Sequence, residues 1–152
     1  MYKRILVPID GSGPSALGLA EAIVLAKNQG AALRLVHVVN ELIIPGRIEI
    51  GWSVMQLIDR LRENGAAILK DGESLVRAAG VEVDTRLIEE VGNHAGRLLV
   101  QEAKDWHADL IAMGTHGRHG IRRAVMGSDA EFVVRHTPVP VLLVRSQEAA
   151  QG

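Results

Sequence analysis

Short runs rich in Val, Ile and Leu alternate along this chain with longer stretches in which apolar residues recur at helical spacing. Runs at residues 5–9, 32–39, 110–113 and 139–144 predict strands, and the alternating residues 81–87 predict a half-exposed strand at a sheet edge. The intervening stretches predict helices over 14–29, 53–79, 93–106 and 128–136. Strands that alternate with helices are typical of an α/β protein with a parallel sheet.

Right-handed crossovers between these strands favour a doubly wound, Rossmann-like sheet of five parallel strands, with the expected order 3-2-1-4-5. In that order the chain reverses direction between strands 1 and 4, and ligands of such sheets bind outside the carboxyl ends at this switch point. The loops there, residues 10–13 and 114–127, are the most glycine-rich of the chain. The topology and the loop composition therefore predict the same place for a ligand site.

Two features of the middle of the chain change this picture only locally. Residues 40–52 are unusually apolar for a connection, which predicts either a lid or a contact surface. Ser53 and Gln56 have the spacing of a capping box at the start of the following helix. Gly65 and Gly72 weaken that helix by about 1 kcal/mol each relative to alanine, so we expect a bend or a break.

Composition limits the classes of function. The 152 residues fit one domain, expected over 1–146 with a flexible tail at 147–152. A formal net charge of −1 provides no general field for nucleic acid or a membrane, so anion binding must be local. The chain has no cysteine, no signal-peptide pattern after Met1 and no apolar stretch long enough to span a bilayer. We expect a cytoplasmic protein.

The stretch from Gly114 to Glu131 has the character of a phosphate cradle. Gly114 and Gly117 can adopt positive φ and leave backbone N–H groups open to an anion, and Gly127 permits close approach to the main chain. Ser128 stands at an expected N-cap, three residues before Glu131, as in a capping box. A helix beginning there directs its positive end at the loop. The alternative is a glycine-rich surface loop followed by an ordinary helix cap.

The spacing Gly114-x2-Gly117-x9-Gly127-Ser128 resembles the nucleotide-binding signature of the universal stress protein family, in its ATP-binding branch. The resemblance covers nearly the whole chain. Further matches to the family pattern are Pro8-Ile9-Asp10-Gly11-Ser12, His37-Val38-Val39, Met113-Gly114 and the strand from Pro138 to Val144.

The resemblance implies roles for particular residues. Ile9, Val38 and Met113 are expected to line an adenine pocket beside Pro8, and Asp10 is expected to face the ribose or a metal, with Mg²⁺ arriving as Mg-ATP. The phosphates are expected at Gly114, Gly117, Gly127, Ser128 and Asp129. The family also implies a homodimer through the strand at 139–144, an apolar edge that would otherwise invite uncontrolled pairing.

Several of these residues have alternative interpretations. Asp129 departs from the small or apolar residue that is common in the family; its carboxylate lies away from the ligand, helps to hold Mg²⁺ or weakens the site. Asp10 could instead make an Asx turn with Ser12. Arg118, with Arg122, Arg123, His116 and His119, either neutralises a triphosphate or forms a solvated loop. His116 and His119 lack a third metal ligand nearby in the sequence.

The leading hypothesis for function is an ATP-binding sensor or regulator of the stress response. A slow ATPase is a second hypothesis, although no G-x-x-x-x-G-K-[ST] loop is present. A nicotinamide-dinucleotide enzyme would use Gly11-x-Gly13-x-x-Ala16, which Pro14 interrupts. A dimeric interaction module with an empty site is the fourth, and Asp129 favours it.

Overall fold

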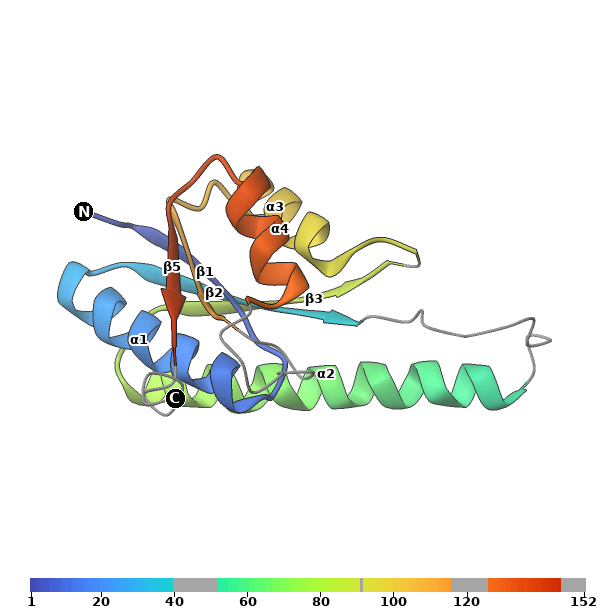
Figure 1. The fold of residues 1–152 in the computed structure, drawn as a ribbon. Coiled ribbons are helices and arrows are strands. Elements are labelled where there is room, and N and C mark those ends of the chain that lie inside the picture. The colour runs from blue at the N-terminus through green and yellow to red at the C-terminus, as the bar shows by residue number, and fades with distance from the viewer. Residues whose placement is uncertain (40–51, 91, 116–125, 146–152) are drawn as a thin grey trace, which may run out of the picture.

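The computed structural model describes residues 1–39, 52–90, 92–115 and 126–145, without the side chains of residues 52 and 53. Its five strands form one parallel sheet in the order β3-β2-β1-β4-β5, so the predicted doubly wound order is confirmed (Figure 1). All neighbouring strands of this sheet are parallel. The strands are β1 Arg4–Pro8, β2 Ala32–Val39, β3 Val83–Glu89, β4 Leu110–Gly114 and β5 Val141–Val144.

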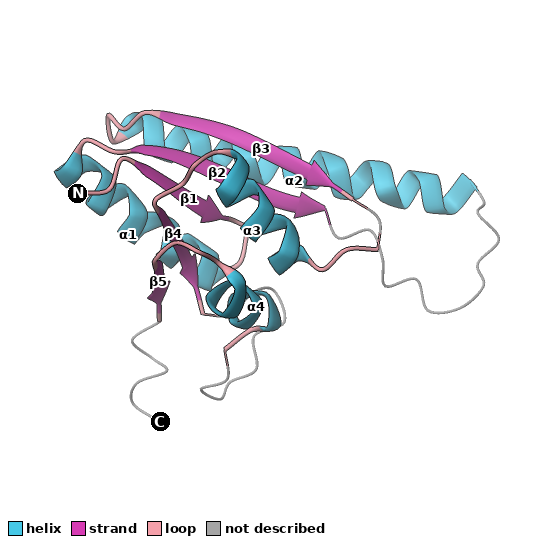
Figure 2. Cartoon of the chain, turned by 90° about the horizontal axis from the view of Figure 1, so that it is seen from above, coloured by secondary structure: helices cyan, strands magenta, loops and turns pink. Residues whose placement is uncertain are grey.

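Four helices cover the sheet in the described ranges, which makes three layers. Helices α1 and α2 lie on one face and α3 and α4 on the other (Figures 1 and 2). Their bounds are α1 Gly13–Gln29, α2 Trp52–Ala78, α3 Ala95–Asp105 and α4 Ser128–His136. Helix α2 begins one residue before the predicted cap Ser53, which therefore lies inside the helix and not at its N-cap.

The last strand begins later than its apolar pattern predicts. Residues 139–144 were expected to be extended, whereas β5 starts at Val141. Pro138 and Pro140 have no N–H group, so they cannot donate to a ladder. The carbonyl of Pro140 nevertheless accepts a hydrogen bond of 3.0 Å from the N–H of Ile111, and this bond aligns the strand.

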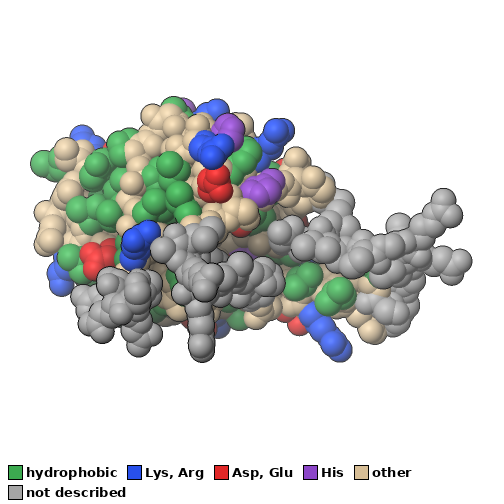
Figure 3. Space-filling model, viewed as in Figure 1, with side chains coloured by type: hydrophobic (Ala, Val, Ile, Leu, Met, Phe, Trp, Pro, Cys, Tyr) green, Lys and Arg blue, Asp and Glu red, His purple; other side chains and the backbone are tan. Residues whose placement is uncertain are grey.

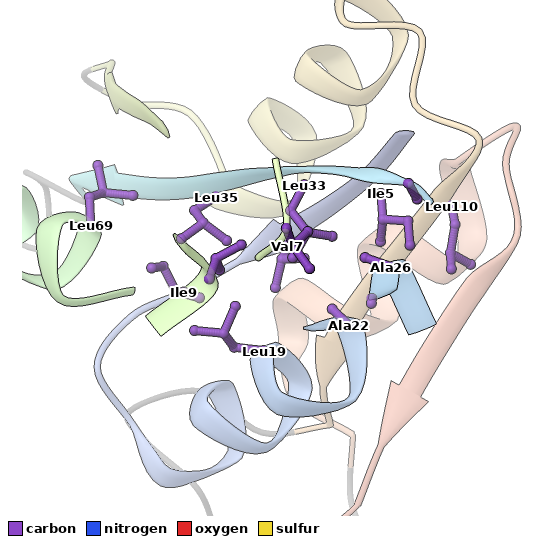
Figure 4. Packing of buried hydrophobic residues seen from close by; sticks show 14 residues of the cluster. Ile5, Val7, Ile9, Leu19, Ala22, Ala26, Leu33, Leu35, Leu69 and Leu110 are labelled. Carbon is purple, nitrogen blue, oxygen red and sulfur yellow. The ribbon is translucent and has the colours of Figure 1, made fainter. Parts of the chain in front are cut away.

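Each face of the sheet has its own hydrophobic cluster. On the α1 and α2 face, Ile5, Val7 and Leu33 pack against Leu19 and Ala22 of α1 and against further residues of both helices (Figure 4). On the opposite face, alternate strand residues such as Leu6, Val36 and Ile111 pack with Leu99 of α3 and Val133 of α4. Residues of odd and even number on one strand therefore belong to different clusters.

The two glycines of α2 bring this helix close to the sheet. A Cβ atom on Gly65 would lie 2.6 Å from Cδ2 of His37, and one on Gly72 would lie 2.9 Å from Cδ1 of Ile9. The helix nevertheless runs without interruption from Trp52 to Ala78, so the expected break is absent. Close packing against β2 and β3 offsets the low helix propensity of glycine.

The two edges of the sheet differ in chemistry. The β3 edge has the charged residues Asp84, Arg86 and Glu89, whereas β5 consists of Val and Leu. Figure 3 shows hydrophobic side chains gathered around β5 and the neighbouring α1. Within the described ranges no helix combines the length and apolar character needed to cross a membrane, and the expected cytoplasmic location stays a prediction.

Candidate functional site

The switch point of the sheet lies between β1 and β4. These strands pair through Ile5 with Leu110 and Leu6 with Ile111. After β1 the chain passes to α1 on one face, and after β4 it leads to α4 on the other (Figure 2). The two connections therefore separate at the carboxyl ends of neighbouring strands, which is the place where ligands of doubly wound sheets bind.

Three side chains build the turn between β1 and α1. Oδ1 of Asp10 accepts the N–H of Ser12 at 2.9 Å, Oγ of Ser12 accepts the N–H of Ser15 at 3.3 Å, and Oγ of Ser15 accepts the N–H of Asp10 at 3.1 Å. Gly11 completes the turn with a φ of 79°. The Asx turn considered as an alternative for Asp10 is therefore present, and it leaves the second carboxylate oxygen outside this ring.

Ser15 is a site residue that the sequence interpretation missed. It is buried, with 7% of its surface exposed, and its hydroxyl closes the ring of hydrogen bonds. Ser12 is the N-cap of α1, so Ser15 stands three residues later, at the position that returns a hydrogen bond in a capping box. This spacing was the signal available in the sequence. The ring fixes the conformation of the loop that leads from β1 to α1.

Gly114 has a packing role that differs from the predicted one. It is not among the described residues with positive φ, which include Gly11, Gly30, Gly80 and Gly92 among the glycines. A Cβ atom on Gly114 would instead meet the backbone of Pro14, with the carbonyl carbon at 2.6 Å. The first turn of α1 thus lies directly against the end of β4. The expected positive φ at Gly114 is absent, and its role toward a phosphate stays a prediction.

Thr115 joins the end of β4 to both later elements. Its N–H donates to the carbonyl of Val144 at 3.1 Å, and its carbonyl accepts the N–H of Gly127 at 2.7 Å. Gly127 is therefore held at the base of the loop, with its N–H engaged by the main chain. Thr115 itself is buried.

Helix α4 begins differently from the prediction. Gly127, with φ −60° and ψ 153°, is the N-cap, and Ser128 is the first helical residue. No side chain caps the helix, so the predicted Ser128–Glu131 capping box is wrong. The backbone N–H of Glu131 donates to the carbonyl of Gly127 at 2.9 Å and closes the first turn. The N–H groups of the preceding helical residues have no intrahelical acceptor, a suitable arrangement for a phosphate.

Asp129 directs its carboxylate at the start of α3. Oδ1 accepts the N–H of Gly96 at 3.2 Å and lies 3.3 Å from Nδ1 of His94, the N-cap residue of α3. A Cβ atom on Gly96 would lie 3.1 Å from the carbonyl oxygen of Asp129, so the two helices meet closely here. Among the three alternatives for Asp129, the structure shows a side chain turned sideways toward α3.

The predicted adenine residues divide between the two faces. Val38 and Met113 lie in the cluster on the α3 and α4 face, and Pro8 follows Leu6 by two residues and so points to the same face. Ile9 belongs to the opposite cluster, beneath Gly72 of α2. The structure therefore brings Pro8, Val38 and Met113 to one face at the carboxyl edge, and leaves the side chain of Ile9 in the core beyond the sheet.

Part of the predicted cradle lies outside the described residues. This applies to Gly117 and Arg118, to the other basic residues of the cluster (His116, His119, Arg122 and Arg123) and to the apolar segment 40–51. Within the described ranges no group of three His, Asp or Glu side chains could hold a metal ion. A role for Asp10 toward Mg²⁺ therefore stays a prediction that depends on the phosphates.

Two interactions away from the switch point support the frame of the site. His37 is buried, and its Nδ1 lies 2.8 Å from the carbonyl oxygen of Ile9, as expected of a hydrogen-bonded core histidine. Arg34 binds Asp84 through two hydrogen bonds of 2.7 Å and Glu102 through one of 2.8 Å. Its guanidinium lies 4.8 Å from the ring centroid of Trp106. The hydrogen bonds to Asp84 raise the pKa of Arg34.

This geometry defines a Rossmann-like α/β protein with a helix N-terminus and a serine-rich turn at the switch point. The sequence model of the universal stress protein family matches residues 1–145. The chain belongs to this family.

Relatives of known sequence and structure agree with that assignment. A putative universal stress protein of Staphylococcus epidermidis is 34% identical over 150 residues, 97% of this chain and 86% of the relative. A universal stress protein of Methanocaldococcus jannaschii is 34% identical over 146 residues, 95% of this chain and 83% of the relative. The crystal structure of a family member from Burkholderia pseudomallei is 31% identical and covers 95% of this chain and 97% of its own, with a TM-score of 0.75.

Two other solved structures share the fold and contain adenine nucleotides. A universal stress protein in complex with cAMP is 23% identical, with a TM-score of 0.67 and coverage of 95% of this chain and 97% of its own. A universal stress protein from Archaeoglobus fulgidus in complex with dAMP is 24% identical, with a TM-score of 0.68 and coverage of 93% and 97%. At this identity the similarity establishes the fold, and the ligands are those of the other two proteins.

Proposed function

We propose that this protein binds an adenine nucleotide, with ATP as the expected ligand, at the switch point of its sheet and acts as a nucleotide-dependent sensor or regulator in the stress response. The observation that carries the proposal is the position of α4. Its N-terminus, at Gly127 and Ser128, begins beside the end of β4 because Gly127 bonds to Thr115. An anion placed there meets first-turn N–H groups that have no intrahelical acceptor, and the positive end of the helix.

The neighbouring residues suit the rest of a nucleotide. Pro8, Val38 and Met113 present apolar side chains on the face of the sheet that α4 covers. Complexes of two fold neighbours with cAMP and dAMP agree with an adenine ligand. Asp10, at the start of the adjacent turn, is the proposed contact for the ribose or for Mg²⁺. Gly117 and Arg118 remain the proposed phosphate ligands from the loop.

Nucleotide binding would act by stabilising the native state of the protein. A ligand that binds only the native state stabilises it by mass action, by about 2.7 kcal/mol at a concentration one hundred times its dissociation constant. A nucleotide held by both the β1 loop and the α4 terminus would join elements from opposite faces of the sheet. The proposed regulatory signal is this nucleotide-dependent change in stability.

We also propose a homodimer formed through the strand at 139–144. The β5 strand is paired with β4 on one side and is short, apolar and half-buried within the single chain, with Leu142 exposed. An apolar edge strand is a template for pairing with a second copy. Light scattering behind size exclusion should give twice the mass of one chain, and a Leu142→Asp variant should give the mass of one chain.

One set of measurements distinguishes the proposed nucleotide-binding sensor from an ATPase, a dinucleotide enzyme and an interaction module. Purified protein is denatured and any released nucleotide is identified by chromatography, and the emptied protein is then titrated with ATP, AMP and NAD in the presence of Mg²⁺. Binding of adenine nucleotides without rapid phosphate release supports the sensor. Sustained phosphate release supports the ATPase, preference for NAD supports a dinucleotide enzyme, and failure of all ligands to bind supports an interaction module and contradicts the proposal.

A further inference from the structure

Asp129 places a carboxylate in the first turn of α4, beside the proposed phosphate position. The residue directly follows Ser128, the first residue of the helix. Its side chain is 48% exposed, and its Oδ1 is fixed by the N–H of Gly96 at 3.2 Å. The carboxylate is therefore a charge held in place at the N-terminal end of α4, where it is turned toward the start of α3.

The described surroundings of Asp129 contain little to neutralise this charge. Within the described ranges no lysine or arginine forms an ion pair with Asp129, and the basic side chain beside it there is that of His94. The N–H of Gly96 also lies 3.2 Å from Nδ1 of His94, so this one N–H group is shared between the two side chains.

A phosphate chain at the start of α4 would meet this charge at close range. The helix end attracts an anion, but its effective charge is about half of an elementary charge, so one carboxylate outweighs it. Two unit charges about 8 Å apart in a water-like medium repel each other enough to change a dissociation constant roughly twofold, and more at a lower effective dielectric constant. The repulsion grows with each negative charge that the ligand adds.

We propose that Asp129 is a specificity-determining residue that discriminates adenine nucleotides by charge. Its carboxylate lowers the affinity for metal-free ATP relative to AMP, whereas the Mg²⁺ complex of ATP, the expected ligand, carries less negative charge and is repelled less. This inference rests on the proposed nucleotide site. It assigns to Asp129 a role toward the ligand that is separate from its hydrogen bond to Gly96, because an amide oxygen at the same position could accept that bond equally well.

The chain offers closely matched variants. Asp129→Asn removes the charge and keeps an acceptor for Gly96, whereas Asp129→Glu keeps the charge. Asp105→Asn is the control, because Oδ1 of Asp105 accepts a hydrogen bond of 2.8 Å from Gln101 that an amide could also accept. Asp105 ends the 11-residue helix α3 that begins beside Asp129, so the two carboxylates lie roughly 15 Å apart, beyond a Debye length of about 10 Å.

The test measures the dissociation constants of AMP, ADP and ATP by equilibrium dialysis in EDTA at an ionic strength of about 0.1 M, where the Debye length is about 10 Å. For Asp129→Asn we expect the affinity for ATP relative to AMP to rise about four- to tenfold, with ADP between them. Asp129→Glu and Asp105→Asn should keep the wild-type ratio within about twofold. A ratio unchanged in Asp129→Asn, or changed equally in Asp105→Asn, overturns the inference and leaves the nucleotide site standing.

Two further arms complete the test. Repeating the titrations with Mg²⁺ distinguishes a metal role, because weaker Mg-ATP binding by Asp129→Asn would overturn charge selection and assign Asp129 to the metal. Asp129→Ser, a second neutral variant, must show the same gain as Asp129→Asn, with thermal unfolding confirming that each variant is folded. Absence of nucleotide binding by both the wild type and the neutral variants would overturn the proposed function and this inference together.

Discussion

The carbonyl carbon of Pro14 lies 2.6 Å from the point that a Cβ atom on Gly114 would occupy. The contact joins the first turn of α1 to the end of β4, two elements about one hundred residues apart in the sequence. Gly18 lies in the same contact, because its Cβ atom would lie 2.9 Å from the backbone nitrogen of Gly114. Backbone packing at the switch point thus requires glycines whether or not a ligand is bound.

This contact predicts that Gly114→Ala destabilises the ligand-free protein. A methyl group pressed against backbone atoms should lower the free energy of unfolding by about 2–3 kcal/mol. Gly13→Ala is the control, because a Cβ atom there meets nothing within 4 Å, and its effect should stay near 0.5 kcal/mol. Chemical denaturation without nucleotide measures both, and equal stability of Gly114→Ala and the wild type would show that the glycine serves the ligand instead.

Gly65→Ala should also destabilise, although alanine has the higher helix propensity. Its methyl group would lie 2.6 Å from Cδ2 of His37 and 2.9 Å from Cδ1 of Leu87. We expect a net loss of about 1–3 kcal/mol, since the crowding exceeds the gain in propensity. In a His37→Ala background, Gly65→Ala should lower the free energy of unfolding by at least about 1 kcal/mol less than it does in the wild type. An equal loss in both backgrounds would contradict the contact.

Arg34→Lys should destabilise the protein, although the positive charge is retained. Lysine cannot reproduce the paired bonds to Asp84, the bond to Glu102 and the contact with Trp106 at once. The expected loss in free energy of unfolding is about 1–2 kcal/mol. Arg77→Lys is the matched control, because Arg77 pairs with Glu73 on the exposed surface of α2 and should change stability by less than about 0.5 kcal/mol. Similar effects of the two substitutions would argue against a structural role for the Arg34 cluster.

The pair of Arg62 and Glu89 predicts a dependence of stability on acidity. Hydrogen bonds from Arg62 at 2.6 and 2.9 Å hold the pKa of Glu89 below its ordinary value of 4.5. The contribution is therefore complete above pH 4.5 and is lost as the pH falls through the lowered pKa. Urea denaturation between neutral and acidic pH should show Glu89→Gln less stable than the wild type at neutral pH, with the difference vanishing in acid. A constant difference would mean that the carboxylate charge is not involved.

The fold could be predicted from the sequence because the hydrophobic patterns of its strands and helices are local. The right-handedness of crossover connections then leaves few possible strand orders. The alternating residues 81–87 indicated an edge strand, and β3 is the edge of the sheet. The start of α4 was less predictable, since Ser128 has the better cap chemistry. The bond between Gly127 and Thr115 decides that start, and it joins two residues that are not neighbours in the sequence.

The sequence was sufficient to predict where the candidate site lies, but not which side chains contact one another there. Alternation along β1 separates Ile9 from Pro8, yet only the packing of α2 shows that Ile9 faces Gly72. The Arg34 cluster could not be foreseen, because its partners lie 50 and 68 residues away in the sequence. The bond from Gly96 to Asp129 likewise depends on how α3 and α4 meet.

Two hydrogen bonds of the Thr115 peptide groups limit where the sequence of this protein can vary without disturbing the sheet. They anchor the chain on both sides of residues 116–126, at β5 and at the start of α4. Lengthening a closed loop is inexpensive, at about 0.6 kcal/mol for each doubling. A change in the number of residues between these anchors would therefore leave β4, β5 and α4 joined by the same two bonds, so the frame can be inherited unchanged while the connecting sequence varies.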